Sequence, residues 1–532
     1  MTETAASAPS TSPWSPLRHR WFFWLWLAGL LSNVGTWMND VGASWLMTTL
    51  ATSPTLVALV QSATSFPAFL FALPAGALAD IVDKRRLLFG AQLFMTLTCT
   101  GFAVLVFFGL VTPHMVLLYV FMMGTGAAIT VPALQSVMPK LVPAEELQSA
   151  VALGSLGTNI SRAIGPAVGG LLIVLFGVAV PFFVNALSFV VMLVVLWKWR
   201  PAASTNSTLP AEHMMEAMRA GIHYARASRA LRHTLWRALF FFGFASAFWA
   251  LLPLITRNVL QGEASLYGVL MALVGAGAVG GAFLLPRFRR LSPDLLVNYS
   301  TVAIVVILTV MALLPTAVTV GVAALCFGVT WIVVVSTLNV SAQLALPDWV
   351  RARGLSVYLA VMFGAMSVGS AVWGQLAGLT SLSTSQLVAA AVGLLGLLIA
   401  RRLQLHQGKA INHAPSGHWP APVLDHMHAK GMEPALTLIH YQVQQEHREA
   451  FLKAVSELSG ARRRLGSYAW DILEDAENPG HFTESFRDLS WLAHMRHHER
   501  VSESDRQLQD ALLPFLVPGT RGRVTHLLSR QT

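Results

Sequence analysis

The fold is decided by a stretch in which two long apolar runs follow each other closely. Residues 55–109 read TLVALVQSATSFPAFLFALPAGALADIVDKRRLLFGAQLFMTLTCTGFAVLVFFG. The apolar runs lie near 55–79 and 87–109, and a short charged segment separates them. A helix needs about 20 apolar residues to cross the hydrocarbon core of a bilayer. Each run is long enough for one transmembrane helix, so the stretch predicts a membrane protein with several spans.

The same pattern continues in both directions from this pair. We predict twelve spans, near 22–48, 55–79, 87–109, 114–138, 148–175, 178–198, 234–256, 265–286, 295–314, 317–345, 355–378 and 384–401. The composition agrees, because 55% of the residues are hydrophobic and 12% are charged. Soluble globular proteins carry about 25% charged residues. The predicted fold class is an all-α membrane protein with twelve transmembrane helices.

The charges between the spans predict the orientation. Basic connections, including Lys84–Arg86 and Arg287–Arg290, alternate with short connections that are almost uncharged. Basic loops stay in the cytoplasm, so an even number of spans places both termini there. The net charge of +10 does not indicate nucleic acid as a partner. Residues 1–402 hold 22 Lys and Arg against 11 Asp and Glu, whereas residues 403–532 hold 14 against 15.

The chain is expected to contain six regions, which include two halves with six spans each. These regions are a disordered cytoplasmic N-terminus (1–20), an N-terminal six-helix bundle (21–200), a cytoplasmic linker (201–233), a C-terminal six-helix bundle (234–402), a second linker (403–433) and a soluble domain (434–532). Met138-Pro139 and Leu346-Pro347 match at an offset of 208, each shortly after a Gln, which indicates pseudo-symmetric halves. Residues 211–232 suit either an amphipathic surface helix or a solvated linker helix.

The segment Gly76-Ala-Leu-Ala-Asp-Ile-Val-Asp-Lys-Arg-Arg86 joins the second and third spans. It resembles the loop G-x-L-A-D-x-x-G-R-R of the major facilitator superfamily, although Asp83 stands where that family usually has Gly. The resemblance implies a conformational latch made by Gly76, Asp80, Arg85 and Arg86. In such a latch Asp80 meets the positive end of a helix and Arg85 bridges to it. An ordinary cluster of charges at a helix end is the alternative.

The fifth span reads Gly157-Thr-Asn-Ile-Ser-Arg-Ala-Ile-Gly-Pro-Ala-Val-Gly-Gly170. It is similar to the antiporter motif G-x-x-x-G-x-x-x-G-P-x-x-G-G of drug exporters. The matching residues are Gly157, Gly165, Pro166, Gly169 and Gly170, and Ser161 replaces one Gly. Glycine allows close helix contact and Pro166 is expected to kink the helix. The similarity implies export, while a generic tight helix contact is the alternative.

Asp40 and Arg162 are the two ionisable residues that we place well inside spans. A charge within the membrane is costly and normally faces a cavity or a partner. Asp40 is therefore a candidate proton carrier whose proton affinity Arg162 controls, and a fixed structural pair is the equal alternative. Polar residues that are candidates for lining a path are Asn33, Gln61, Asn159, Asn339 and Gln343.

The membrane part resembles the branch of the superfamily that contains enterobactin exporters, also called transmembrane secretion effectors. The resembling stretches are Ser32–Trp37, Asn159–Pro166 and Leu251–Pro253. The resemblance implies proton antiport that exports a small organic molecule, such as a siderophore, drug or secondary metabolite, without a cofactor. A substrate importer and a membrane-anchored enzyme or sensor acting through the tail remain alternatives.

The tail has the pattern of a soluble domain. From residue 434 the order β-α-β-β-α-β predicts an α+β ferredoxin-like sandwich. Arg462–Trp470 and Ser490–Arg500 resemble the antibiotic-biosynthesis-monooxygenase-like domain found at the end of some members of the branch. His406, His413, His418, His426 and His428 in the preceding linker have loose spacing, and no metal site is expected there.

Four aromatic side chains of the tail raise the question of catalysis. Trp470, Trp491, His494 and His498 are candidates for lining a pocket, and the two histidines share one helix face at i and i+4. Two histidines without Glu or Cys are a weak metal signal. Packing inside the domain or a dimer contact explains these residues equally well, so we expect a transporter, no enzyme and no metal.

Overall fold

The structure is a computed structural model that describes residues 12, 14–200, 214–347, 349–405, 416, 419 and 433–529. The chain divides into two compact units. The first, here the helical unit, contains residues 1–214, 235–339 and 358–404. The second, here the tail unit, contains residues 215–234, 340–357 and 405–532.

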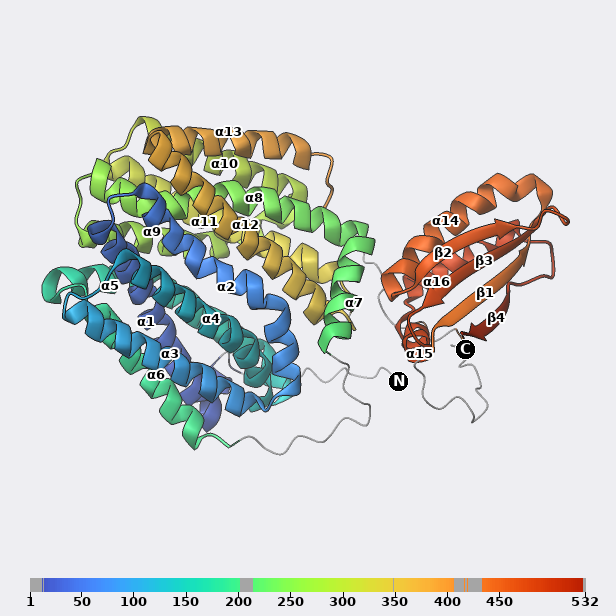
Figure 1. The fold of residues 1–532 in the computed structure, drawn as a ribbon, viewed down its shortest axis with the longest axis horizontal. Helices are drawn as coiled ribbons and strands as arrows, with labels where there is room; N and C mark the ends of the chain where they lie inside the picture. The colour runs from blue at the N-terminus through green and yellow to red at the C-terminus, as the bar shows by residue number, and fades with distance from the viewer. Residues whose placement is uncertain are drawn as a thin grey trace, which may run out of the picture. The chain divides into compact units, whose positions relative to one another are not determined.

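Long helices build the helical unit (Figure 1). Their bounds are α1 (Arg20–Leu50), α2 (Pro54–Ile81), α3 (Lys84–Phe107), α4 (Pro113–Val137), α5 (Leu147–Phe176), α6 (Val180–Lys198), α8 (Arg229–Leu254), α9 (Ala264–Leu284), α10 (Pro293–Leu313), α11 (Ala317–Leu344), α12 (Arg351–Leu379) and α13 (Leu382–Ala400). Within the described ranges, eleven of these helices are long and apolar enough to cross a membrane. The helix outside that set is α1, which is long enough at 31 residues but contains Asn33, Asn39 and Asp40.

Several helices begin at residues with clear capping chemistry. The side chain of Asp83 accepts the backbone N–H of Arg86 at 2.8 Å, so it caps α3. Asp83 has a φ of −53°, and the turn therefore needs no Gly at this position. One predicted boundary is wrong by five residues: α8 begins at Arg229 because the Ser228 hydroxyl accepts the backbone N–H of Leu231 at 3.3 Å.

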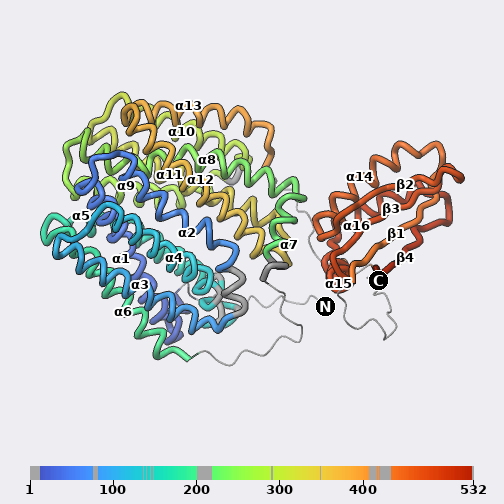
Figure 2. Tube along the Cα trace, in the orientation of Figure 1, coloured from blue at the N-terminus to red at the C-terminus, as the bar shows by residue number. Residues whose placement is uncertain are grey.

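The two halves of the helical unit pack in the same pattern. In the first half α2 packs on α4 and α3 packs on α6, and in the second half α10 packs on α13. The counterpart of the α2–α4 contact is α9 on α11, where a Cβ added at Gly277 would clash with the backbone oxygen of Leu325. The helices α1–α6, coloured from blue to turquoise-green, and the helices α8–α13, coloured from green to orange, accordingly form two groups (Figures 1 and 2). This agrees with the internal repeat predicted from the sequence.

The tail unit contains a four-stranded antiparallel sheet. Its elements are β1 (Ala435–Gln442), α14 (Arg448–Leu465), β2 (Tyr468–Glu474), β3 (His481–Asp488), α15 (Trp491–Arg500), α16 (Glu503–Asp510) and β4 (Arg523–Leu528). The strand order is β2-β3-β1-β4, and each paired strand is antiparallel. Apolar side chains from one sheet face, such as Ile439 and Phe486, share a core with Phe451 and Leu458 of α14. The predicted order of strands and helices is thus present.

The tail unit also contains α7 (Met214–Ala227) from residue 215 onward and the connection between α11 and α12. The Tyr224 hydroxyl of α7 donates to the backbone oxygen of Ala345 at 3.0 Å. Gly221 lies so close to Arg353 that an added Cβ would be 2.9 Å from the Arg353 Cβ. The helix predicted over 211–232 therefore forms packed contacts with the α11–α12 connection.

Candidate functional site: the interface between the two halves

The first half meets the second along α5 and α9, where glycines bring the backbones together. A Cβ added at Gly170 would lie 2.7 Å from the oxygen of Ala264 and 3.0 Å from the Cα of Gly268. A Cβ added at Gly268 would lie 2.7 Å from the oxygen of Pro166. Real Cβ atoms do not approach other atoms this closely, so only Gly fits both helices here.

The opposite edge of α5 packs on α1 through other residues of the same sequence motif. A Cβ at Gly165 would lie 2.6 Å from the Cβ of Trp37, and one at Gly169 would lie 2.9 Å from the Cα of Met38. Ser161, which replaces a Gly of the motif, is buried and donates its hydroxyl to the Gly157 oxygen at 2.9 Å. The motif residues thus place α5 between α1 and α9.

A second contact between the halves is made by α2 and α12. The Ser62 hydroxyl donates to the backbone oxygen of Ser367 at 2.7 Å, and the Ser367 hydroxyl donates to the oxygen of Ser62 at 3.1 Å. Farther along, Thr55 contacts Gly374, where an added Cβ would clash with Ala58. Small residues again allow two helices of different halves to approach closely.

Two side-chain contacts identify the end of the unit at which these interfaces lie. Arg257, after α8, donates to the hydroxyl of Thr48 at 3.3 Å. Trp45 of α1 stacks on Tyr267 of α9, with ring centres 6.2 Å apart. Thr48 closes α1 and Tyr267 lies near the start of α9. The halves therefore touch at the end that carries the α1–α2 connection.

Asp40 and Arg162, which the sequence offers either as a proton carrier with its controlling cation or as a fixed structural pair, have separate partners in this conformation. The guanidinium carbon of Arg162 lies 5.5 Å from the ring centre of Trp37, within the range of a cation–π contact. Among the described residues we find no ion pair between Arg162 and Asp40. The backbone oxygen of Arg162 faces Gly275 of α9. The aromatic ring one helical turn before Asp40 contacts the cation instead.

Asp40 has aromatic hydroxyl groups as neighbours, which the sequence did not reveal. Its carboxyl group interacts electrostatically with the phenols of Tyr119 and Tyr267. Tyr119 also donates a hydrogen bond to the side chain of the buried Asn39, next to Asp40 in the chain. Tyr267 belongs to the second half, so Asp40 lies beside the interface between the halves.

Two of the predicted lining residues form hydrogen bonds within their own helices. Gln61 donates to Ser65 on its own helix at 3.2 Å, and Asn159 donates to the backbone oxygen of Ser155 at 2.9 Å. The predicted residues with exposed surface are Asn33 and Gln343, whereas Gln61, Asn159 and Asn339 are half-buried. Gln61 and Asn159 therefore bond within their own helices.

The predicted latch residues are described only in part. Gly76 and Asp80 lie at the end of α2, but their side chains are outside the described part of the chain. Arg85 donates its Nε hydrogen to the backbone oxygen of Leu196 at 2.9 Å and also bonds the oxygen of Trp197. It therefore caps the C-terminal end of α6, where the helix dipole is negative. Arg86 is exposed.

The second half uses a different residue, Arg237, for the same task. Its side chain is 2% exposed and donates to the backbone oxygens of Leu403 and Ala400 at 2.6 and 3.0 Å. It also forms a 2.7 Å ion pair with Asp294 at the start of α10. Sequence reasoning missed this group because Arg237 reads as one more basic residue at a span boundary.

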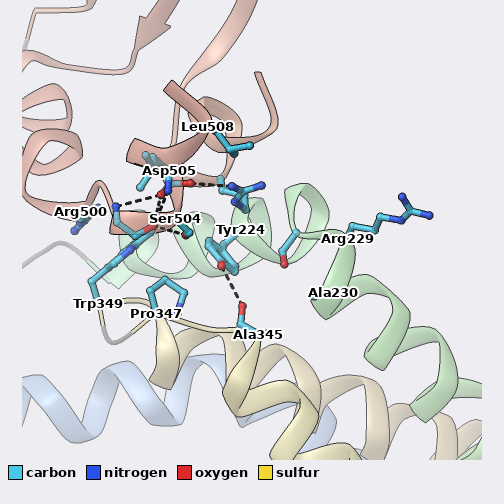
Figure 3. Close-up of a pocket in the computed structure, with 14 residues that line it drawn as sticks. Tyr224, Arg229, Ala230, Ala345, Pro347, Trp349, Arg500, Ser504, Asp505 and Leu508 are labelled. Carbon is cyan, nitrogen blue, oxygen red and sulfur yellow. Dashed lines mark hydrogen bonds and ion pairs between the residues drawn. The ribbon is translucent and has the colours of Figure 1, made fainter. Parts of the chain in front are cut away.

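Within the tail unit, a cavity of about 310 Å³ lies between α7, the α11–α12 connection and the end of the sheet domain (Figure 3). Arg500 places its guanidinium carbon 4.3 Å from the ring centre of Trp349. Arg464 forms a 2.8 Å ion pair with Asp505. Burial is the main cause that raises the pKa of Tyr224, to about 12, so its hydroxyl stays protonated and donates to Ala345.

Three of the four predicted aromatic residues of the tail lie in two polar networks, and the fourth, Trp491, packs its ring on His494 with ring centres 5.2 Å apart. The indole of Trp470 donates to the buried carboxylate of Glu484 at 3.0 Å, and Arg462 pairs with that carboxylate at 3.1 Å. His494 and His498 belong to the other network, with their Nε2 atoms 3.1 Å apart. Both histidines come from α15, as the i, i+4 spacing predicted.

Asp488 at the end of β3 anchors the histidine network. Its Oδ2 is 2.7 Å from Nδ1 of His494, and its Oδ1 accepts the Ser467 hydroxyl at 2.8 Å. Burial by itself raises the pKa of Asp488, but hydrogen bonds from His494 and His497 outweigh burial and hold the pKa well below its usual range. Burial and the neighbouring His494 lower the pKa of His498 to about 4.

Comparison with known protein families and sequences finds transporters. The family model described as "Transmembrane secretion effector" matches residues 11–532. The chain is 24% identical over 266 residues to a staphyloferrin A transporter of Staphylococcus aureus, a match that covers 49% of this chain and 66% of the relative. It is 27% identical over 393 residues to the enterobactin exporter EntS of Escherichia coli O1:K1, covering 72% of this chain and 90% of the relative. A macrolide efflux protein A of Streptococcus pyogenes is 22% identical, covering 55% and 73%.

Solved structures with the same fold are also transporters. The nucleoside transporter NupG, as a D323A mutant, superposes with a TM-score of 0.60 at 13% identity, covering 72% of this chain and 99% of that one. A bacterial homologue of the lysosomal transporter Spinster, in an inward-facing and unoccupied conformation, gives 0.56 at 13% identity, covering 73% and 98%. At these identities the likeness shows the fold alone.

Proposed function

Because the chain belongs to the transmembrane secretion effector family of major facilitator transporters, we propose that it exports a small organic molecule across a bacterial inner membrane by proton antiport. Members and relatives of this family are transporters, so the expectation of a transporter rather than an enzyme is confirmed. A siderophore, drug or secondary metabolite is the proposed substrate class. The similarity to a staphyloferrin A transporter, an enterobactin exporter and a macrolide efflux protein supports that class. The exporter and the efflux protein also support the outward direction.

The proposed mechanism is alternating access between two six-helix halves, with α1 as the twelfth span. The charge alternation along the chain supports cytoplasmic termini. With that orientation, the end that carries the α1–α2 connection faces the periplasm. The contacts of Ser62 with Ser367 and of Gly170 with Gly268 then close the periplasmic side. We infer that this conformation is inward-facing, ready to accept substrate from the cytoplasm, and that export requires these contacts to break.

Asp40 is the proposed proton carrier, and its position supports the role. A carboxylate inside the membrane costs about 2.5–3.5 kcal/mol on insertion scales, and protonation removes that cost. Asp40 lies beside the interface, within electrostatic reach of Tyr267 on the other half. Its protonation state therefore changes the interaction between the two halves, which is what coupling requires. In this proposal Arg162 influences the proton affinity of Asp40 without a direct contact, because its guanidinium lies over the Trp37 ring in this conformation.

The two sequence motifs receive separate proposed roles. Gly170 and Pro166 lie at the close contact with α9 that opens and closes, whereas Gly165 and Gly169 hold α5 against α1, and this arrangement supports the antiporter interpretation. Gly76, Asp80, Arg85 and Arg86 are the proposed latch. The contact of Arg85 with the end of α6 supports the latch, because it connects the α2–α3 loop to the helix that packs on α3.

For the tail we infer a ferredoxin-like fold of the monooxygenase-like type without catalytic activity in the transport cycle. Its support is the element order β-α-β-β-α-β combined with the strand order β2-β3-β1-β4. A contact with a second copy, which the sequence leaves open beside packing inside the domain, stays a prediction. Exposed apolar side chains on the outer strands, Leu473 of β2 and Leu527 of β4, favour it.

The family match carries the proposal, and metabolite export tests it. Medium from wild-type cells and from cells lacking the gene is compared for small organic molecules, with complementation by the intact chain. Loss of one or more compounds from the medium, with accumulation inside the cells, is expected. Inverted vesicles then test direction: uptake of that compound driven by a proton gradient, acidic inside, is expected for an exporter. Equal media, or uptake into intact cells, would contradict export.

A further inference from the structure

Four polar side chains of the tail unit converge at one end of the sheet domain. Asp488 ends β3, His526 lies in β4, and His494 and His498 project from α15. One ligand atom from each of His494, His498 and His526 lies within 4.8 Å of the others. We propose that these three histidines bind one divalent transition-metal ion, with Asp488 orienting His494.

The antiparallel register explains why residues so far apart in sequence meet. Asp488 pairs with Ala435 of β1, and His526 pairs with Thr437, two residues farther along the same strand. Side chains two residues apart on a strand point to the same face, so Asp488 and His526 share one face of the sheet. The core residue Phe486 lies on that face too. The α15 histidines reach the cluster from the helix that packs on β3.

The hydrogen bond to Asp488 determines which atom of His494 is free for a metal. A carboxylate only accepts hydrogen bonds, so Nδ1 of His494, 2.7 Å from Asp488, carries the hydrogen. The lone pair of the neutral ring is then on Nε2, which faces Nε2 of His498 at 3.1 Å. A carboxylate that orients a histidine in this way is the usual partner of a metal-bound imidazole.

The spacing suits tetrahedral coordination. Zinc–nitrogen bonds of about 2.0–2.1 Å at tetrahedral angles put two ligand nitrogens about 3.3 Å apart. The Nε2 atoms of His494 and His498 are already 3.1 Å apart, and a ligand atom of His526 lies within 4.8 Å of both histidines. Three imidazoles favour Zn²⁺, Ni²⁺, Cu²⁺ or Co²⁺ over Mg²⁺ or Ca²⁺. His526 is only half-buried, so a fourth coordination position opens toward solvent and is available to water or a small ligand.

The site is independent of the proposed transport function, because all its residues belong to the tail unit. The test uses the full-length protein in detergent, purified through a tag without histidine and stripped with a chelator. Zinc is titrated by calorimetry, and Co²⁺ serves as a second probe because tetrahedral Co²⁺ absorbs visible light strongly. One ion per chain and a tetrahedral Co²⁺ spectrum are expected.

Ligand variants and matched controls decide the location. His498→Ala and His526→Ala should each weaken zinc binding by more than about 100-fold. Asp488→Asn should weaken it by about 10–100-fold, as for other residues that hydrogen-bond a metal-bound histidine. His440→Ala is the control, because His440 is exposed on the opposite sheet face and bonds Thr483. His498→Gln and His526→Gln repeat the test with side chains of similar size, and the thermal transition reports folding. A variant that replaces the five linker histidines, His406, His413, His418, His426 and His428, should bind zinc normally. Three outcomes would overturn the site. They are zinc binding that survives in folded His498 and His526 variants, no zinc binding by the intact chain, and loss of zinc binding when the linker histidines are replaced.

Discussion

Ser62 on α2 and Ser367 on α12 each donate a hydroxyl hydrogen to the other's backbone oxygen, at 2.7 and 3.1 Å. The two serines are 305 residues apart and belong to different halves of the helical unit. Such a reciprocal pair requires the two helix backbones to be close, and both side chains are buried. The contact is therefore a direct marker of the conformation in which the halves touch at this end.

A disulfide across this contact should lock the transporter. We expect Ser62→Cys combined with Ser367→Cys, in a chain with Cys99→Ser and Cys326→Ser, to crosslink under mild oxidation and to lose efflux. Alternating access requires the two helices to separate, so reduction should restore efflux. The matched control is Ser62→Cys with Val368→Cys, because Val368 is the next residue and is 66% exposed. Undiminished efflux by a fully crosslinked Ser62–Ser367 pair would contradict the inward-facing assignment.

A methyl group at Gly170 should separate α5 from α9. We expect Gly170→Ala to reduce transport at least several-fold while the protein remains in the membrane, because its Cβ would lie 2.7 Å from the Ala264 oxygen. Gly154→Ala in the same helix is the control, since no atom lies within 4 Å of a Cβ there. Transport is measured per molecule of membrane protein. Equal effects of the two substitutions would mean that the contact is not specific.

Removing the charge of Asp40 should uncouple transport from the proton gradient. We expect Asp40→Asn to bind substrate but to show no active efflux at any external pH between about 6 and 8. Because Arg162 lies on Trp37 rather than on Asp40, adding Arg162→Gln should not restore efflux. Substrate binding to purified protein and efflux from cells give the two readouts. Normal, pH-responsive efflux by Asp40→Asn would refute the proton-carrier role. Recovery of efflux in the double variant would instead support a structural pair of Asp40 and Arg162.

Arg237 should be essential for stability rather than for the transport cycle. Its buried guanidinium bonds Asp294 and two backbone oxygens at the end of α13. We expect Arg237→Met to lower the free energy of unfolding by about 3–5 kcal/mol, as for other buried ion pairs that lose one partner. Arg232→Met, at an exposed position five residues earlier in α8, should have little effect. Thermal unfolding in detergent measures both, and an unchanged transition in Arg237→Met would refute the structural role.

The buried pair of Glu484 and Arg462 should make the tail sensitive to acid. Burial raises the pKa of Glu484, but the charge of Arg462 and its hydrogen bond outweigh burial and hold the pKa below its ordinary value. The pair thus contributes stability above the unfolded-state pKa of about 4.5, and this contribution is lost as the pH falls through the lower folded-state value. We expect amide exchange in β3 to accelerate steeply below that pH. Glu484→Gln should accelerate exchange already at pH 7 and remove most of the acid dependence.

The tail unit shows which features of the fold local sequence patterns can predict. Alternating apolar residues over 436–443 and the predicted strand at His481–Asp488 were confirmed by β1 and β3. The pairing of Asp488 with His526 in one cluster could not be predicted, because it depends on the register of β1 with both neighbours. The i, i+4 spacing of His494 and His498 was visible, but two histidines on one helix do not make a metal site without the third.

Hydrophobic run lengths, loop charges and glycine spacing in the sequence alone determined the helical class, the division into halves and the close packing of α5. These properties are local, since a bilayer selects apolar segments of a given length and only Gly allows backbone contact. Only the tertiary structure decided which groups meet: Arg162 with Trp37 instead of Asp40, Arg237 with the end of α13, and Ser62 with Ser367. Such pairings depend on helix rotation and on contacts across hundreds of residues, and a long side chain can reach several partners from one position.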